Sequence, residues 1–222
     1  ANPSATQKIT TQAESAKSAE SQAAYDAGVK AQGENKLDDA ITSYKKAIEL
    51  APKEPSFYYA LGTAYQAKND LDTALANYKI AYGLNPREPA YKTVIKQVQQ
   101  AKAAPLSQSA IDKQMKNDIP GAIADYRASL AIDDDPSTRM NFGTALQAAN
   151  KPAEAVEEYK RAVAADAKTC VDAYYYMGTA YEALNKPPAA VAAYNQYLRI
   201  APTGQNAKTC RDRVKLLAPA HR

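Results

Sequence analysis

The side chains that could perform chemistry are few, and their spacing does not bring them into one catalytic site. The only histidine, His221, is the residue before the last, so a Ser–His or Cys–His pair would depend on a chain end that frays. Carboxylate pairs such as Asp38/Asp39 and Glu157/Glu158 fall on predicted helices, where they are typical of solvated faces. We therefore predict that the chain is not an enzyme and that it uses no cofactor.

An acidic run, Asp133-Asp134-Asp135, invites the hypothesis of a calcium site. It lacks the spaced ligand set and the distal bidentate glutamate of a calcium-binding loop. A helix start explains the run better, with Asp135 as the cap and Pro136 in the first helical turn, where negative charge is stabilising. We predict no metal site.

Two cysteines, Cys170 and Cys210, each end the tetrapeptide Ala-Lys-Thr-Cys. They fall in predicted neighbouring elements, which favours a disulfide. Their offset of six residues on the repeat frame corresponds to about 9 Å of helical rise, more than the roughly 7 Å that a bridge spans. Both states stay open. A bridge, together with a chain that starts at Ala1 instead of Met, would favour an exported protein (periplasmic or extracellular) over a cytoplasmic one.

Composition limits the remaining possibilities. Hydrophobic residues make up 45% of the 222 residues and charged residues 23%, which is typical of a globular chain. No apolar run approaches the roughly 20 residues that cross a bilayer. The net charge of +4 is spread evenly, with 11 basic and 9 acidic residues in 21–105 and 15 and 13 in 106–222. Nucleic acid is therefore not an expected partner, because its binding sites gather Lys and Arg.

A segment with the pattern Ala-x3-Tyr recurs along the chain. Its copies are Ala40/Tyr44, Ala74/Tyr78, Ala122/Tyr126, Ala155/Tyr159 and Ala190/Tyr194, and the first two are 34 residues apart. A second pattern, a large apolar residue followed by Gly-Thr-Ala, begins at Leu61, Phe142 and Met177. Self-similarity with this period is typical of stacked helical repeats.

These residues resemble the tetratricopeptide repeat, whose unit is a pair of antiparallel helices, A and B. The resemblance implies an all-α fold, a right-handed solenoid of stacked helix pairs that forms a superhelix. The residues agree with it. Tyr58, Leu61 and Tyr65 would form one apolar stripe, and Gly62 and Ala74 are small where two helices must approach. The B helices should end before Pro52, Pro86 and Pro202.

The predicted repeats are 21–54, 55–88, 103–136, 136–170 and 171–204. Between the second and third lies an insert, 90–102, that resembles the last helix, 207–217, because both contain Lys-Thr-x4-Val six residues after a repeat-ending proline. Two unrelated amphipathic helices would also fit. We prefer an extra helix in the middle and a C-terminal capping helix. The predicted organisation is a tail or partly helical extension (1–20), two repeats plus cap (21–105) and three repeats plus cap (106–219), with a break or kink near Ala103–Leu106.

In the family, helix A lines a concave surface that binds the ligand. The corresponding residues are Tyr25, Val29, Tyr59, Thr63, Gln66, Met140, Asn141, Thr144, Gln147, Tyr175, Tyr176, Thr179 and Glu182. Tyrosines beside amides and hydroxyls suit an extended peptide or a helix. For Tyr25 and Tyr176, packing against the next repeat is an equally good interpretation.

The best-known ligand mode of the family, a clamp for the C-terminal carboxylate of chaperones, needs lysines and an arginine beside its asparagines. Only Asn141 matches, so a clamped carboxylate would lack its charge partners. We expect a scaffold or adaptor that binds a peptide or helix of a partner protein in the groove. Family analogy narrows this to bacterial envelope or secretion assembly. The alternative is a self-assembling structural protein that uses its convex face or end caps. The partner and the oligomeric state stay open.

Overall fold

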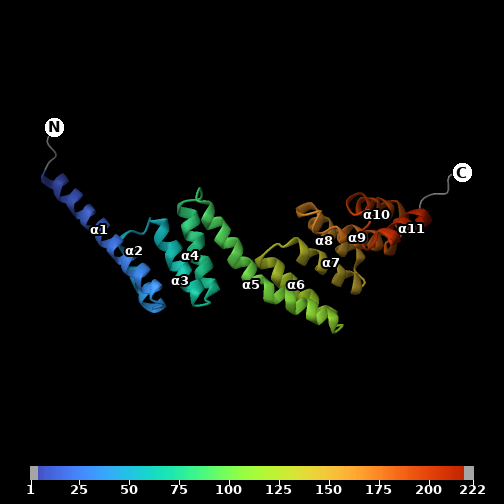
Figure 1. Cartoon of the computed structure of the whole chain (residues 1–222), viewed down its shortest axis with the longest axis horizontal. Helices are drawn as coiled ribbons and strands as arrows, with labels where there is room; N and C mark the ends of the chain where they lie inside the picture. Colours follow the sequence, from blue (N-terminus) through green and yellow to red (C-terminus); the bar gives the residue numbers. More distant parts are fainter. Residues whose placement is uncertain (1–4, 218–222) are drawn as a thin grey trace. The chain divides into compact units, whose positions relative to one another are not determined.

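The chain folds into α-helices. The computed structural model describes residues 5–217, and every regular element in that range is an α-helix (Figure 1), which confirms the expected all-α class. The helices are α1 (Ala5–Gly33), α2 (Leu37–Leu50), α3 (Pro55–Ala67), α4 (Leu71–Leu84), α5 (Pro89–Met115), α6 (Ile119–Ile132), α7 (Pro136–Ala148), α8 (Pro152–Ala165), α9 (Asp172–Ala183), α10 (Pro187–Ile200) and α11 (Ala207–Leu217).

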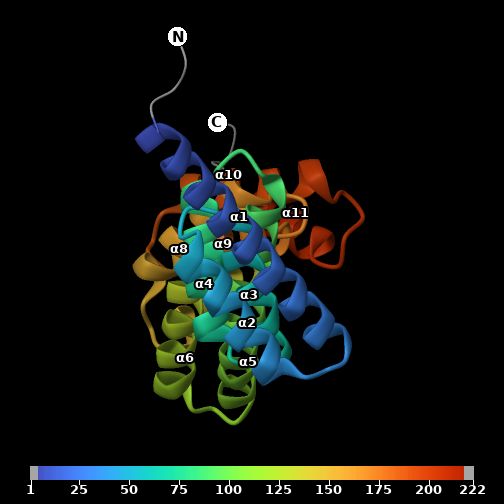
Figure 2. The same ribbon diagram turned by 90° about the vertical axis from the view of Figure 1, so that its left-hand side faces the viewer.

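Helices that follow one another in the chain pack together. Backbone contacts divide the chain into two compact units, residues 1–99 and 100–222. In the first unit, α1 packs on α2, α2 on α3 and α3 on α4, and Figure 2 shows α1 and α2 side by side. In the second, the same order runs from α6 to α11. Consecutive helix pairs are therefore layered as a repeat architecture requires.

A left-handed asparagine ends helix A in each of the five repeats. These residues are Asn35, Asn69, Asn117, Asn150 and Asn185, with φ between 54° and 63°. The short polar side chain of asparagine makes this conformation accessible. The amide of the following residue donates to the carbonyl five residues earlier, as from Lys36 to Ala31 at 2.9 Å. This closure of the helix end fixes the tight turn into helix B.

Glycine in helix A lets a tyrosine of helix B lie against its backbone. The pairs are Gly28/Tyr44, Gly62/Tyr78, Gly143/Tyr159 and Gly178/Tyr194, and an added Cβ would lie 2.3–2.8 Å from the nearest ring atoms. All four rings are buried. The small residues predicted at the helix crossing are thus required by an aromatic ring. In the third repeat Ala110 takes the glycine position and is itself fully buried.

Of the break or kink expected near Ala103–Leu106, the break is absent, because α5 runs as one helix from Pro89 to Met115 with Pro105 inside it. Proline removes one backbone hydrogen bond, to the carbonyl of Ala101. Ala101 is exposed, so water can donate a hydrogen bond to its carbonyl. The predicted middle helix is therefore the first part of α5, and the helix A of the third repeat is its last part.

Helix ends follow the predicted local chemistry. The B helices α2, α4 and α10 end two residues before Pro52, Pro86 and Pro202. The Asp135 carboxylate accepts the amide of Thr138 at 2.7 Å, which makes it the predicted cap of α7. Helix α1 includes residues 5–20 of the predicted extension. Residues 1–4, Pro219 and His221 lie outside the described residues.

Two glycines of the first unit give a test of this packing. Gly62→Ala should lower the free energy of unfolding by about 1–3 kcal/mol, because its Cβ overlaps the Tyr78 ring. Gly83→Ala has no atom within 4 Å of its added Cβ and should raise it by about 0.5–1 kcal/mol. Urea unfolding followed by circular dichroism measures both. Equal effects of the two substitutions would contradict the packing role.

Candidate partner-binding groove

The buried tyrosines of the B helices donate hydrogen bonds to glutamines of helix A. The pairs are Tyr44–Gln32 at 2.9 Å, Tyr78–Gln66 at 2.7 Å, Tyr126–Gln114 at 3.1 Å and Tyr159–Gln147 at 2.5 Å. Each glutamine lies twelve residues before its tyrosine. A hydroxyl that enters the core with its ring keeps a partner in this way, and an unpaired one would cost about 1–3 kcal/mol.

Three of these glutamines, Gln32, Gln114 and Gln147, also connect one repeat to the next. Their side-chain NH₂ groups donate to threonine hydroxyls on the following helix A, in the pairs Gln32–Thr63, Gln114–Thr144 and Gln147–Thr179. Each threonine in turn donates to the backbone carbonyl three residues earlier. We call this series from tyrosine through glutamine to threonine the relay. Five residues predicted to face the ligand, Thr63, Gln66, Thr144, Gln147 and Thr179, are therefore occupied within the fold.

The last link of the relay is ionic. Glu182 takes the position of the glutamine and accepts the Tyr194 hydroxyl at 2.6 Å. Its carboxylate also accepts Nε of Arg213 at 2.9 Å and a second hydrogen bond from Nη2 of the same guanidinium. Arg213 belongs to α11, so the capping helix supplies an arginine where a further repeat would supply threonine.

Burial changes the acidity of the relay tyrosines. It raises the pKa of Tyr44 and of Tyr126 to about 12. Burial also raises the pKa values of Tyr78, Tyr159 and Tyr194. The cause is the same in each case, because a phenolate would lose its hydration inside the helix pair.

The tyrosines predicted as ligand anchors also pack between repeats. The Tyr25 ring stacks on Phe57 with centroids 5.1 Å apart, and Tyr176 stacks on Tyr159 at 6.0 Å. Tyr59 lies between Tyr78 and Tyr91, at 5.5 and 5.4 Å. These four anchor rings, Tyr25, Tyr59, Tyr175 and Tyr176, are half-buried. Their edges remain available, but truncating them would disturb the fold as well as a ligand.

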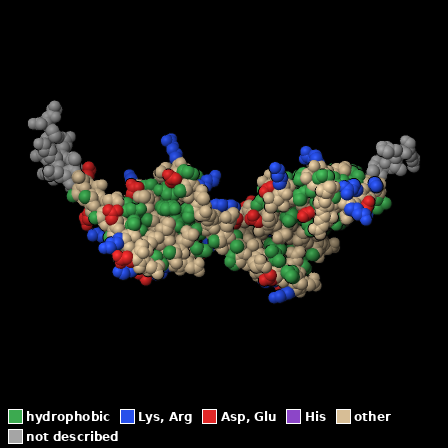
Figure 3. Space-filling model, viewed as in Figure 1, with side chains coloured by type: hydrophobic (Ala, Val, Ile, Leu, Met, Phe, Trp, Pro, Cys, Tyr) green, Lys and Arg blue, Asp and Glu red, His purple; other side chains and the backbone are tan. Residues whose placement is uncertain are grey.

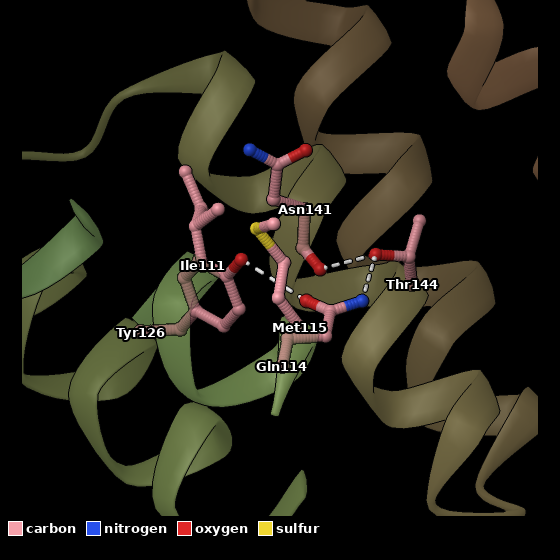
Figure 4. Close-up of a pocket in the computed structure, with 6 residues that line it drawn as sticks. All are labelled: Ile111, Gln114, Met115, Tyr126, Asn141 and Thr144. Carbon is pink, nitrogen blue, oxygen red and sulfur yellow. Dashed lines mark hydrogen bonds between the residues drawn. The ribbon is translucent and has the colours of Figure 1, made fainter. Parts of the chain in front are cut away.

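One hollow of about 400 Å³ opens in the second unit, where α5 and α6 meet α7. Ile111, Gln114, Met115, Tyr126, Asn141 and Thr144 line it (Figure 4). Gln114 and Thr144 are bonded within the relay, whereas no hydrogen bond to the Asn141 side-chain amide exists among the described residues. We call this the first hollow. Its walls are apolar, the polar side chains at its floor already have hydrogen-bond partners, and the side-chain amide of Asn141 is free to bind a ligand.

A second hollow of about 270 Å³ lies between α9 and α11. Its lining is Tyr175, Thr179, Glu182, Tyr194, Thr209 and Arg213. Glu182 and Arg213 face each other there as an ion pair. Helix α7 carries Asn141 and Thr144 of the first hollow, and its Gln147 donates to Thr179 of the second. We call the two hollows and the surface of α7 and α9 between them the groove.

Sequence reasoning located only part of this groove. Asn141, Thr144, Tyr175, Thr179 and Glu182 line the hollows as predicted positions, whereas Met140 is half-buried against the core and Val29 is exposed on α1. Ile111, Gln114 and Met115 were missed because the third repeat lacks the glycine that marks its helix A. A glutamine twelve residues before each Ala-x3-Tyr tyrosine would have located Gln114.

The two cysteines are free in this structure. Cys170 packs with the core around Tyr159, whereas Cys210 packs with Tyr194 and Tyr197. They belong to different buried clusters, and the disulfide that the sequence left open stays a hypothesis. Burial raises the pKa of Cys170, and it raises that of Cys210 to about 11. Both thiols are therefore poor nucleophiles at neutral pH.

No group of three or more His, Cys, Asp or Glu side chains within residues 5–217 is arranged to hold a metal ion. None of the helices in that range combines the length and apolar character needed to cross a bilayer.

The fold and the relay define a protein built of stacked helical hairpins, and comparison with known families agrees. Residues 34–69 match a family described as TPR repeat, and residues 55–88 and 140–204 match families described as tetratricopeptide repeat. The chain belongs to the tetratricopeptide-repeat family. No curated protein matches its sequence.

Solved structures show related folds. The first TPR domain of Spaghetti (RPAP3), bound to the HSP90 peptide SRMEEVD, has a TM-score of 0.50 and 25% identity over 54% of this chain and 96% of its own. The TPR domain of Arabidopsis OM64 has a TM-score of 0.50 and 19% identity, over 53% and 98%. The latter likeness concerns the fold alone.

Alkaline pH should weaken the fold through the relay. The pKa of folded Tyr126 is about 12, whereas a tyrosine of the unfolded chain ionises near pH 10. The stability that this difference provides is complete below about pH 10 and is lost as the pH rises toward 12. The free energy of unfolding, measured with urea at a series of fixed pH values, should fall less steeply with rising pH for Tyr126→Phe than for wild type. Tyr82→Phe, at an exposed ring, should keep the wild-type slope.

The ionic link should be measurable by a double-mutant cycle. Glu182→Gln with Arg213→Gln should reveal a coupling energy of about 0.5–1 kcal/mol, and 1 M salt should reduce it. The exposed pair Lys151–Glu154 is the control and should give less than about 0.5 kcal/mol. Equal coupling in the two pairs would show that α11 does not depend on this link.

Proposed function

We propose that the chain is a scaffold or adaptor, not an enzyme, and that its groove binds a peptide or helix of a partner protein. The observation that carries the proposal is the first hollow, where the free amide of Asn141 lies beside Ile111 and Met115. An amide can pair with both the N–H and the C=O of an extended backbone. The bound peptide in the similar domain of Spaghetti (RPAP3) supports the same use of the fold.

The other residues predicted to contact a ligand remain part of this proposal, but they contribute less to it than Asn141. In the first unit they are Tyr25, Val29, Tyr59, Thr63 and Gln66, and in the second Met140, Gln147 and Tyr176 accompany the residues of the hollows. Those in the relay offer a ligand only the lone pairs that the fold leaves unused. A nucleic-acid partner is not proposed, because Lys and Arg lie scattered over the face seen in Figure 3.

A narrower proposal, assembly of the bacterial envelope or of a secretion system, rests on family resemblance. The structure adds no support for export, because the cysteines are free. Self-assembly is the second candidate function. It is favoured by the exposed side chains Ile80, Tyr82 and Leu84 near the end of α4, at 37–44% exposure. Light scattering across a dilution series separates the two, because a strict monomer excludes self-assembly.

Photo-crosslinking tests the groove directly. A benzophenone side chain in place of Asn141 should crosslink to a specific protein in an extract of the source cells. The same side chain in place of Glu157, which is exposed on α8, should not. The crosslinked protein then serves as the ligand for binding measurements.

Asn141→Ala should weaken binding of that partner about tenfold, the equivalent of one hydrogen bond of about 1.4 kcal/mol, while circular dichroism stays unchanged. Asn195→Ala is the matched control, because Asn195 is exposed on the B helix α10. Asn141→Ala is a cleaner test than Tyr175→Ala, since Tyr175 also packs on Tyr194. Unchanged affinity in Asn141→Ala would reject the groove as the binding site.

A further inference from the structure

The two most exposed large hydrophobic side chains in the described part of the chain are Met115, at 82%, and Leu216, at 69%. Met115 lines the first hollow. Leu216 follows Arg213 by three residues and Thr209 by seven, so helical geometry places it on the face of α11 that borders the second hollow. Exposed apolar side chains that lie along one groove, instead of singly on the surface, mark an interaction site.

The lining of the groove carries no unpaired charge. The first hollow contains no charged side chain. In the second, the guanidinium of Arg213 is bonded to the Glu182 carboxylate. A charged ligand group placed in either hollow would lose hydration without gaining an ion partner, which is strongly unfavourable.

Most polar side chains that line the hollows also have hydrogen-bond partners already. Gln114 and Thr144 are bonded within the relay, as is Thr179. What remains for a ligand is the Asn141 amide and the apolar surface of Ile111, Met115 and Leu216. This combination suits a polypeptide backbone that carries apolar side chains.

We infer that the occupant of the groove is an uncharged internal segment of another protein. One of its apolar side chains is buried against Ile111 and Met115 in the first hollow, and another is buried against Leu216 beside the second. The inference rests on the proposed function and names the chemistry of its ligand. The driving force is removal of apolar surface from water, at about 25 cal/mol per Å². A C-terminal carboxylate has no place in this arrangement.

A second copy of the chain fits the groove less well. The exposed apolar residues Ile80 and Leu84 are held on α4 beside the cations Lys79 and Arg87. Docking them would bring positive charge to hollows whose lining offers no free carboxylate. A flexible segment without charges avoids this cost.

Selection from peptide libraries tests the inference. One library displays random twelve-residue peptides with a linker at both ends, and a second displays them with a free C-terminus. The first library should yield binders with two apolar side chains and no charge between them. The synthetic peptide SRMEEVD, with its acidic end and free carboxylate, should bind at least tenfold more weakly than a selected peptide in fluorescence anisotropy.

Variants locate the binding. Met115→Asp and Leu216→Asp should each lower the affinity for the selected peptides at least tenfold. Both side chains are exposed enough for the variants to fold. Ile80→Asp is the matched control, since Ile80 is 44% exposed on α4, and it should leave binding unchanged. Circular dichroism confirms that all three variants are folded.

The outcomes distinguish failure of the inference from failure of the proposed function. Selection of charged or carboxylate-ended peptides whose binding depends on Asn141 would overturn the inference and keep the proposed function. No enrichment, or binders insensitive to Asn141, Met115 and Leu216, would overturn both. Concentration-dependent self-association in sedimentation velocity that Met115→Asp abolishes would identify a second copy as the occupant, and would also overturn the inference.

Discussion

Each helix pair buries a tyrosine ring whose hydroxyl must keep a hydrogen bond, and much of the structure follows from that requirement. The ring of Tyr78 reaches the core because Gly62 has no side chain to obstruct it. Its hydroxyl then needs a partner at a fixed place, which Gln66 supplies. Loss of the partner would leave a desolvated hydroxyl, at a cost comparable to that of a cavity in the core. Glycine, tyrosine and glutamine therefore form one unit of three coupled positions.

This coupling also determines what the groove can offer. In a repeat with free glutamines and threonines, a ligand would find many donors and acceptors along helix A. Here Gln147 is bonded to Tyr159 and to Thr179, so its orientation is fixed before any ligand arrives. A ligand that competed for these groups would have to replace existing bonds and would gain little. If the proposed function holds, apolar contact and the amide of Asn141 are what the groove has left for selecting a ligand.

The sequence predicts the repeated part of this architecture well. Period, helix order, terminating prolines and the cap Asp135 all depend on local chemistry that a single chain displays. Reasoning from the sequence failed where the outcome depended on a balance with water or with a distant helix. Pro105 stays inside α5 because the exposed Ala101 carbonyl can be hydrated. Gln114 was overlooked because its role is visible only once Tyr126 of another helix is seen to need it. The half-buried packing of Tyr59 likewise depends on Tyr91, which lies beyond its own repeat.

The capping helix has a larger role than sealing the end of a stack. A cap that only covered apolar surface would need Ala207, Cys210 and their neighbours against α10. Helix α11 also sends Arg213 into the relay, where Glu182 has replaced glutamine and the pair satisfies the Tyr194 hydroxyl in place of a further repeat. The same exchange introduces one negative and one positive charge into the groove and cancels them there. Because the charges cancel, the end of the groove stays as uncharged as its beginning at Met115. The two hollows therefore share the absence of an unpaired charge, although only the second, where α11 contributes Arg213, contains an ion pair.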